Sequence, residues 1–125
     1  MFNKSQIIEI LQSLPFSKTD YWITSGAAMV IYGFKETTRD IDLGCSSVLA
    51  DQLQSMGYLT KILDDNTRHI IYSPEIEFFE NWIEGSLNTI DEMQIVSVDG
   101  LIKMKLALGR DKDLKDIEII KSFLE

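Results

Sequence analysis

Apolar residues recur at helical spacing in some segments of the chain and alternate with polar residues in others, which predicts a mixture of helices and short strands. In the first half, we expect helices over residues 4–14, 27–32 and 48–56 and strands over residues 22–24 and 40–44. Turn-forming residues mark the expected helix ends, because Pro15, Gly33 and Gly57 each follow an apolar helical stretch.

The second half predicts more strands and then two helices. We expect strands over residues 58–63, 68–73, 75–82 and 94–98, the first two forming a hairpin across the polar turn 64–67, while residues 86–93 fit no clear pattern. Asp99 is expected to cap a helix that ends at Gly109, and Asp111 is expected to cap the last helix. The predicted apolar stripe of that last helix is Leu114, Ile117, Ile120 and Leu124. With no repeat and no linker, the prediction is one α+β domain over residues 1–125, a mixed sheet with helices packed on it.

Composition narrows the class of protein. Hydrophobic residues make up 45% of the chain, enough for a core and unlike a disordered sequence. No apolar run approaches 18 residues and the N-terminus lacks a signal-peptide pattern, so we expect a cytoplasmic protein with no membrane contact. One cysteine, Cys45, fits a reducing compartment, and with a single histidine, His69, it cannot supply the four ligands of structural zinc. His69 lies in an apolar run and is interpreted as a strand residue.

The charge is acidic overall but uneven. A net charge of −8 argues against broad nucleic-acid binding, which depends on neutralising phosphates. Six of the twelve basic residues nevertheless fall within residues 101–125, whereas residues 61–100 hold two basic residues against nine acids. A metal–triphosphate complex would need such a basic region beside an acidic site. The alternative is that the basic residues form an ordinary solvated helix face.

Asp40 and Asp42 are the first candidates for chemistry. Strand residues two apart point to the same face, with α-carbons about 6.6 Å apart, so both carboxylates can converge on one divalent cation. Like charges held side by side repel unless a cation lies between them. The alternative is a merely solvated strand face, although Asp is uncommon in strands.

The setting of this pair resembles a known family. Residues 25–33 read Ser-Gly-Ala-Ala-Met-Val-Ile-Tyr-Gly, residues 37–43 read Thr-Thr-Arg-Asp-Ile-Asp-Leu, and residues 106–117 read Leu-Ala-Leu-Gly-Arg-Asp-Lys-Asp-Leu-Lys-Asp-Ile. Together they resemble the nucleotidyltransferase superfamily, with its polymerase-beta-like fold, and especially the small prokaryotic abortive-infection and toxin–antitoxin members. The resemblance covers most of the chain.

Two positions depart from the family pattern. Ser25 stands where the first turn glycine is usual, and it is less free in φ than glycine. The third carboxylate best matches Glu77, one methylene longer than the family's usual Asp, and Glu75 is the other candidate. Glu77 is preferred because it lies in the middle of the expected strand, whereas Glu75 directly follows Pro74. Both glutamates also fit the ordinary role of edge charges that deter aggregation.

The resemblance implies a role for each matched residue. Asp40 and Asp42 would bind Mg²⁺ (or Mn²⁺), and Glu77 would bind a second metal or accept a proton from the acceptor hydroxyl. Ser25 and Gly26 would hold the β- and γ-phosphates. Lys105 and Arg110 would form a supporting positive surface with Lys112 behind them, and Arg39 is expected to be structural.

The implied reaction is transfer of an NMP from an NTP to a hydroxyl acceptor with release of pyrophosphate. The acceptor class, a small molecule, an RNA end or a protein, stays open. Because 125 residues leave little room for an acceptor domain, a homodimer or a partner protein is expected to complete the site. The alternatives are a catalytically silent binding protein with this fold, acting as an antitoxin or regulatory partner, and a plain structural domain.

Overall fold

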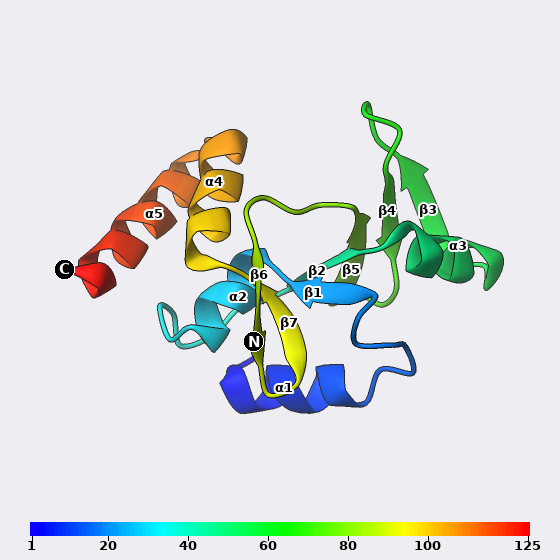
Figure 1. The fold of residues 1–125 in the computed structure, drawn as a ribbon, viewed down its shortest axis with the longest axis horizontal. Helices are drawn as coiled ribbons and strands as arrows, with labels where there is room; N and C mark the ends of the chain where they lie inside the picture. Colours follow the sequence, from blue (N-terminus) through cyan, green and yellow to red (C-terminus); the bar gives the residue numbers. More distant parts are fainter.

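The computed structural model describes residues 1–125 and contains five helices and seven strands (Figure 1). In chain order the elements are α1 (Lys4–Gln12), β1 (Tyr21–Ile23), α2 (Ser25–Ile31), β2 (Ile41–Cys45), α3 (Ser47–Ser55), β3 (Leu59–Ile62), β4 (Arg68–Ile71), β5 (Ile76–Glu80), β6 (Leu87–Ile90), β7 (Met93–Val96), α4 (Val98–Leu108) and α5 (Asp111–Leu124). None of the helices combines the length and the apolar content needed to cross a lipid bilayer.

All seven strands form one mixed sheet in the order β3-β4-β5-β2-β1-β7-β6. The pairs β2–β5 and β1–β7 are parallel, and the other four pairs are antiparallel. The predicted α+β class with a mixed sheet is therefore confirmed, and so is the hairpin of β3 and β4.

The two faces of the sheet have different roles. Ile41, Leu43 and Cys45 alternate along β2 and are fully buried in a core of 24 residues that also takes in most of α2. The opposite face carries Asp42 and Gly44 on β2. Register extends this face across neighbouring strands, where Asp42 pairs with Glu77, and Gly44 pairs with both Trp22 and Phe79. The chemistry-bearing residues thus lie on the face away from the apolar side of β2.

Several helix boundaries differ from the predictions, and α2 begins at Ser25 rather than at residue 27. α1 ends at Gln12 rather than near residue 14. Ser97, not Asp99, is the N-cap of α4, since its hydroxyl accepts a hydrogen bond from the Gly100 amide at 3.0 Å. Arg110, not Asp111, occupies the N-cap position of α5. Both aspartates lie instead in the first turn of their helices, where a negative charge favours the helix N-terminus.

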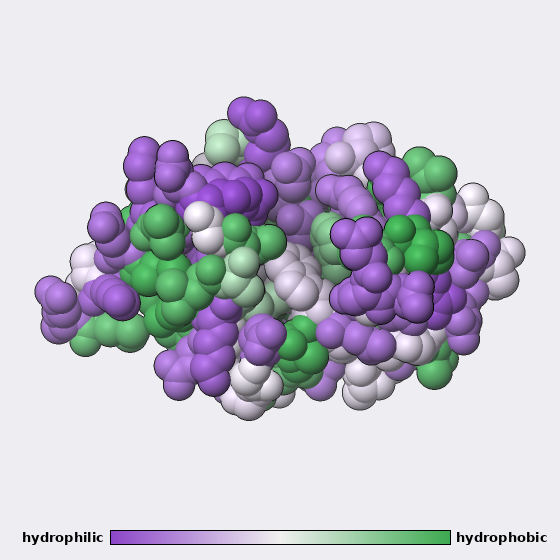
Figure 2. Space-filling model, turned by 90° about the horizontal axis from the view of Figure 1, so that it is seen from above, coloured by the Kyte–Doolittle hydropathy of each residue, from purple (hydrophilic) through white to green (hydrophobic).

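The predicted apolar stripe of α5 is partly wrong. Leu114 and Leu124 are 46% and 62% exposed, and the buried residues of the helix are Asp113, Asp116, Ile117 and Ile120. These four positions share one helical face, and its two acids are buried because they pair with basic residues of the α4–α5 region. Leu114 is consequently left in solvent, and Figure 2 shows hydrophobic side chains gathered on the surface at the end of the molecule formed by α4 and α5.

The unassigned segment 86–93 contains β6 and forms a hairpin with β7. Asp91 and Glu92 join the two strands with φ of +50° and +67°. Positive φ at both central residues is the signature of the type I′ turn that suits hairpins.

Candidate functional site

A polar cavity of about 520 Å³ lies among the start of α2, the segment before β2 and the junction of α4 with α5. It is lined by six residues predicted for the site, namely Ser25, Gly26, Asp40, Asp42, Lys105 and Arg110. The remaining lining residues are Met1, Lys35, Thr38, Arg39, Lys112, Asp113 and Asp116. Three segments far apart in the sequence therefore bring acids and bases to one hollow, and Glu77 does not line it.

Two threonines hold the backbone of the aspartate pair. β2 begins at Ile41, so Asp40 precedes the strand rather than opening it as expected. The hydroxyl of Thr24, which is completely buried, donates to the Asp42 carbonyl at 2.9 Å, and the Thr38 hydroxyl donates to the Asp40 carbonyl at 3.1 Å. Neither threonine was identified from the sequence, because a hydroxyl bonded to backbone leaves no periodic signal.

The Ser-Gly turn beside this pair is conformationally demanding. Ser25 adopts φ of +51°, the left-handed region in which glycine is favoured. At Gly26, a β-carbon would lie 2.5 Å from the Thr38 hydroxyl. A larger residue here would therefore displace the hydroxyl that donates to the Asp40 carbonyl.

Asp42 carries the most perturbed carboxylate of the cavity. Its Oδ1 atom is buried and has no hydrogen-bond partner. Burial raises its pKa to about 6, with Glu77 and Asp40 adding repulsion and with His69 and Lys112 opposing the shift. A buried carboxylate oxygen without a partner is costly, and a cation at this position would remove the cost.

Glu77 lies next to Asp42 in register but its carboxylate is engaged elsewhere. Its Oε1 atom is 2.6 Å from His69 Nε2, and the imidazole stacks on Phe79 with ring centroids 4.3 Å apart. No group of three or more His, Cys, Asp or Glu side chains is arranged to hold a metal ion. The structure thus does not assemble the expected three-carboxylate set of Asp40, Asp42 and Glu77. Sequence reasoning treated His69 as a plain strand residue, whereas it reaches Glu77 diagonally across β4 and β5.

Lys105 lies on the cavity wall but is not the surface cation that we expected. It is only 3% exposed, and its Nζ atom lies 2.8 Å from Asp116 and 3.9 Å from Asp113. Arg110 also forms an ion pair, with its Nε atom 2.6 Å from Asp113 Oδ2. Although burial alone would raise the pKa of Asp116, hydrogen bonds from Lys105 and Lys35 hold that pKa below its usual value. The Lys105 pairs join α4 to α5, and the pair of Lys35 with Asp116, at 2.7 Å, joins α5 to the segment before β2.

Two cations of the cavity remain without a carboxylate partner. Lys112 and Arg39 are exposed and form no ion pair. The positive charge of Lys112 acts on Asp42, where it opposes the raised pKa. Lys112, which we had placed behind Lys105 and Arg110, and Arg39, which we had expected to be structural, are therefore both free to meet an anion.

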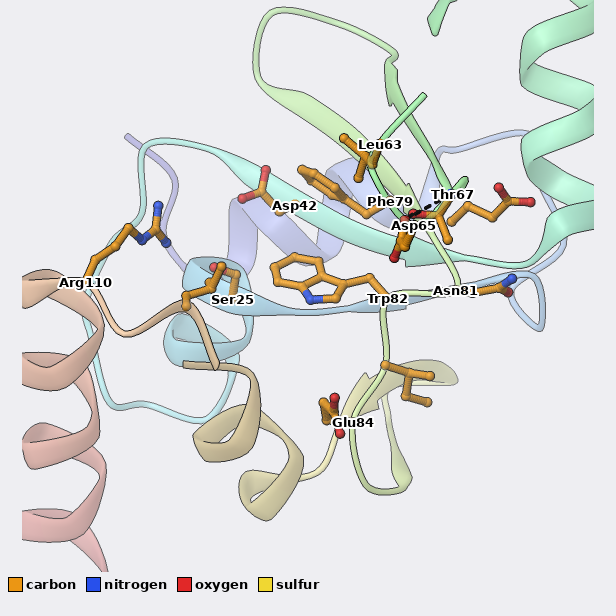
Figure 3. A pocket seen from close by; sticks show the side chains of 13 residues that line it. Ser25, Asp42, Leu63, Asp65, Thr67, Phe79, Asn81, Trp82, Glu84 and Arg110 are labelled. Atoms are coloured by element: carbon orange, nitrogen blue, oxygen red, sulfur yellow. Dashed lines mark hydrogen bonds between the residues drawn. The ribbon is translucent and has the colours of Figure 1, made fainter. Parts of the chain in front are cut away.

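A second cavity of about 520 Å³ adjoins the first and shares Ser25, Asp42 and Arg110 with it. Figure 3 shows Trp82 near its centre, with those three residues to one side. The hydrophobic lining residues are Leu63, Phe79, Trp82, Ile83 and Leu108. None of these was predicted for the site, because an apolar residue in a cavity has the same sequence pattern as one in a core.

The residues present suit one divalent cation. Mg²⁺ is usually bound by one or two carboxylates together with substrate phosphates and water. Asp40 and Asp42 supply two carboxylates on the polar cavity, and the unpartnered Oδ1 of Asp42 fits a metal ligand. A second cation held by Glu77 does not fit, because His69 already occupies that carboxylate.

Comparisons with family models, with curated proteins and with solved structures found no match to this chain.

Proposed function

We propose that the chain is a metal-dependent nucleotidyltransferase that moves an NMP from an NTP to a hydroxyl acceptor and releases pyrophosphate. The observation that carries the proposal is the buried, unpartnered Oδ1 of Asp42, beside Asp40, in a cavity that also holds unpaired basic residues. Carboxylates for a metal and cations for phosphates are the two requirements of a metal–triphosphate substrate. The motif resemblance, with its nucleotidyltransferase-like fold, points the same way.

The aspartate pair and the two unpaired cations of the polar cavity bind the metal–nucleotide complex. Asp40 and Asp42 would hold Mg²⁺ or Mn²⁺, which neutralises charge on the transferring phosphoryl group when bound. Lys112 and Arg39 would attract the β- and γ-phosphates, since neither is neutralised by a carboxylate. Lys105 and Arg110 act differently, because their ion pairs fix α4 and α5 against the cavity.

We assign Glu77, oriented by His69, to accept the proton of the acceptor hydroxyl. In the transfer, the acceptor oxygen forms a bond to the α-phosphorus while the bond to the β-phosphate oxygen breaks. The acceptor hydroxyl must lose its proton, and Glu77 is the carboxylate next to Asp42 in register. Its hydrogen bond to His69 fixes the orientation of the carboxylate. Of the two roles that the resemblance implied for Glu77, the geometry favours proton acceptance over binding a second metal.

The test combines binding with turnover. Melting temperatures would be measured with each NTP in Mg²⁺ or Mn²⁺, followed by transfer of α-labelled and γ-labelled nucleotide to molecules of a cell extract. The proposal expects metal-dependent stabilisation and transfer of the α-label but not the γ-label. Loss of both responses in Asp42→Asn would tie them to the site, and absence of any nucleotide response in the wild type would overturn the proposal.

The second candidate is a catalytically silent protein of the same fold that acts as an antitoxin or regulatory partner. The observation in its favour is the engagement of Glu77 by His69, which leaves no three-carboxylate centre. Metal-dependent nucleotide binding without transfer of either label would select this candidate.

A further inference from the structure

The second cavity, which contains Trp82 and is hereafter the apolar cavity, has a lining that differs sharply from that of the polar cavity. The polar cavity is lined by five basic residues and only one hydrophobic residue, whereas Arg110 is the only basic residue of the apolar cavity. Phosphates therefore favour the polar side. Aromatic and aliphatic side chains on the other side suit a flat, uncharged ring.

Phe79, one of the residues that line this cavity, belongs to a row of residues across the sheet. Trp22, Gly44 and Phe79 are register partners on β1, β2 and β5. A β-carbon at Gly44 would lie 1.9 Å from the Trp22 indole nitrogen, so the indole lies directly over the glycine. The indole can take this position only because residue 44 has no side chain.

This row also fixes Trp82. The Trp22 indole nitrogen donates a hydrogen bond to the Trp82 carbonyl at 2.9 Å. The Trp82 ring lies 5.0 Å from the ring of Phe79, which in turn stacks on His69. Trp82 is only partly buried and faces the cavity (Figure 3), so it is held in place with a ring surface available to a ligand.

The junction of the two cavities sets the position of the ligand. Ser25, Asp42 and Arg110 belong to both linings, so a molecule with a charged and an aromatic part can place its midpoint beside Asp42. In an NTP the α-phosphate is that midpoint, with the triphosphate on one side and the nucleoside on the other. On the nucleoside side, Asp65 and Glu84 offer carboxylates, which accept hydrogen bonds and repel phosphates.

Resting on the proposed function, we infer that the apolar cavity is the nucleoside subsite, in which the base stacks on Trp82. Stacking on an aromatic side chain tolerates every base, so Trp82 is expected to serve all four NTPs. The acidic lining makes the end of a nucleic acid a poor occupant.

The experiment compares NTPs with inorganic tripolyphosphate, both with Mg²⁺, by calorimetry on the full chain. The variants are Trp82→Leu, which removes the stacking ring, and Trp82→Phe, which keeps a smaller one. Phe123→Leu is the matched control, since Phe123 is an exposed aromatic residue on α5 outside both cavities. Retained melting temperatures show which variants are folded.

The inference expects wild type to bind ATP, CTP, GTP and UTP about tenfold more tightly than tripolyphosphate. Trp82→Leu should remove this advantage without changing tripolyphosphate binding, Trp82→Phe should keep part of it, and Phe123→Leu should keep all of it.

Several results would overturn the inference. Equal binding of NTPs and tripolyphosphate by the wild type would refute a nucleoside subsite while leaving the proposed function intact. Unchanged NTP affinity in Trp82→Leu, with a raised KM for the acceptor, would assign the cavity to the acceptor instead. If neither NTP nor tripolyphosphate binds, the proposed function fails together with the inference.

Discussion

Asp42 on β2 and Glu77 on β5 are register partners on neighbouring parallel strands, yet the Glu77 carboxylate is hydrogen-bonded to His69 rather than joined with Asp42 in one acidic cluster. The two carboxylates therefore experience different surroundings. The Asp42 oxygen Oδ1 is buried without a partner, whereas Glu77 Oε1 has an imidazole 2.6 Å away. This asymmetry separates a candidate metal ligand from a candidate proton acceptor and gives each its own test.

Replacing Asp42 by Asn should stabilise the metal-free protein at pH 8. Because burial and the neighbouring acids raise the pKa of Asp42 to about 6, above its ordinary value of 3.8, the ionised carboxylate destabilises the fold above pH 6. The gain should be about 3 kcal/mol at pH 8, given 1.36 kcal/mol per pKa unit, and should diminish as the pH falls from 6 towards 4. Chemical denaturation in EDTA at several pH values measures it.

The control for Asp42→Asn is Asp64→Asn, an exposed carboxylate in the β3–β4 turn that should change stability by less than about 0.5 kcal/mol. Destabilisation of Asp42→Asn at pH 8 would mean that Asp42 is a structural residue and not a strained ligand.

Replacing Glu77 by Gln should impair transfer more than nucleotide binding. A positioned proton acceptor contributes about 10²–10⁴ in rate, so single-turnover transfer should fall by at least about a hundredfold. The melting shift produced by metal and NTP should survive, because the proposed ligands Asp40 and Asp42 are unchanged. Single-turnover transfer and thermal melts on the same sample measure the two effects.

Glu75→Gln is the matched control for Glu77, since Glu75 is exposed and precedes β5. Equal transfer by Glu77→Gln and the wild type would remove Glu77 from the site, and loss of transfer in Glu75→Gln alone would exchange the two roles.

Replacing Glu80 by Gln should destabilise the fold in a pH-dependent way. Arg68 donates to both Glu80 oxygens, at 3.0 and 2.6 Å, and these hydrogen bonds lower the Glu80 pKa to about 2 from an ordinary 4.5. The stabilisation is therefore fully present above pH 4.5 and is lost as the pH falls through 2. Removing one partner of a buried pair costs about 3 kcal/mol, which denaturation at pH 7 should detect and which should shrink below pH 4.

Asp51→Asn is the comparison for Glu80→Gln, because Asp51 contacts the same arginine at 2.7 Å but its side chain is 73% exposed. Its loss should cost less than about 1 kcal/mol. Similar losses in the two variants at pH 7 would show that burial does not strengthen the Arg68–Glu80 pair.

Sequence patterns predicted the mixed sheet, most elements and six of the thirteen residues that line the polar cavity, and they failed where tertiary pairing determined the outcome. The Asp91–Glu92 turn was missed because its two positive φ angles are usually signalled by Asn-Gly or Asp-Gly. Leu114 was assigned to the core because hydropathy cannot reveal that α5 buries Asp113 and Asp116 instead. That burial depends on Lys105, eleven residues before Asp116, so no local pattern records it.

The side-chain hydrogen bond between β4 and β5 could not be predicted from the sequence either. The His69–Glu77 contact requires the register of β4 against β5, which a sequence with an irregular connection at residues 72–75 does not specify. The aspartate pair was predictable because its spacing and its following apolar residues are local.

Substitution of Lys112 should change nucleotide binding, whereas substitution of Lys105 should change stability, although both side chains line the polar cavity. Lys112→Ala removes an exposed cation with no ion pair, so it should weaken binding of metal–NTP without lowering stability. The loss should be several-fold at 50 mM salt and smaller at 300 mM, because screening weakens attraction between exposed charges. Lys105→Ala removes the buried partner of Asp116 and should destabilise the fold by about 3 kcal/mol. Calorimetry at the two salt concentrations and chemical denaturation of both variants separate the effects. A stable Lys105→Ala variant with salt-dependent loss of binding, together with wild-type binding in Lys112→Ala, would return the phosphate role to Lys105.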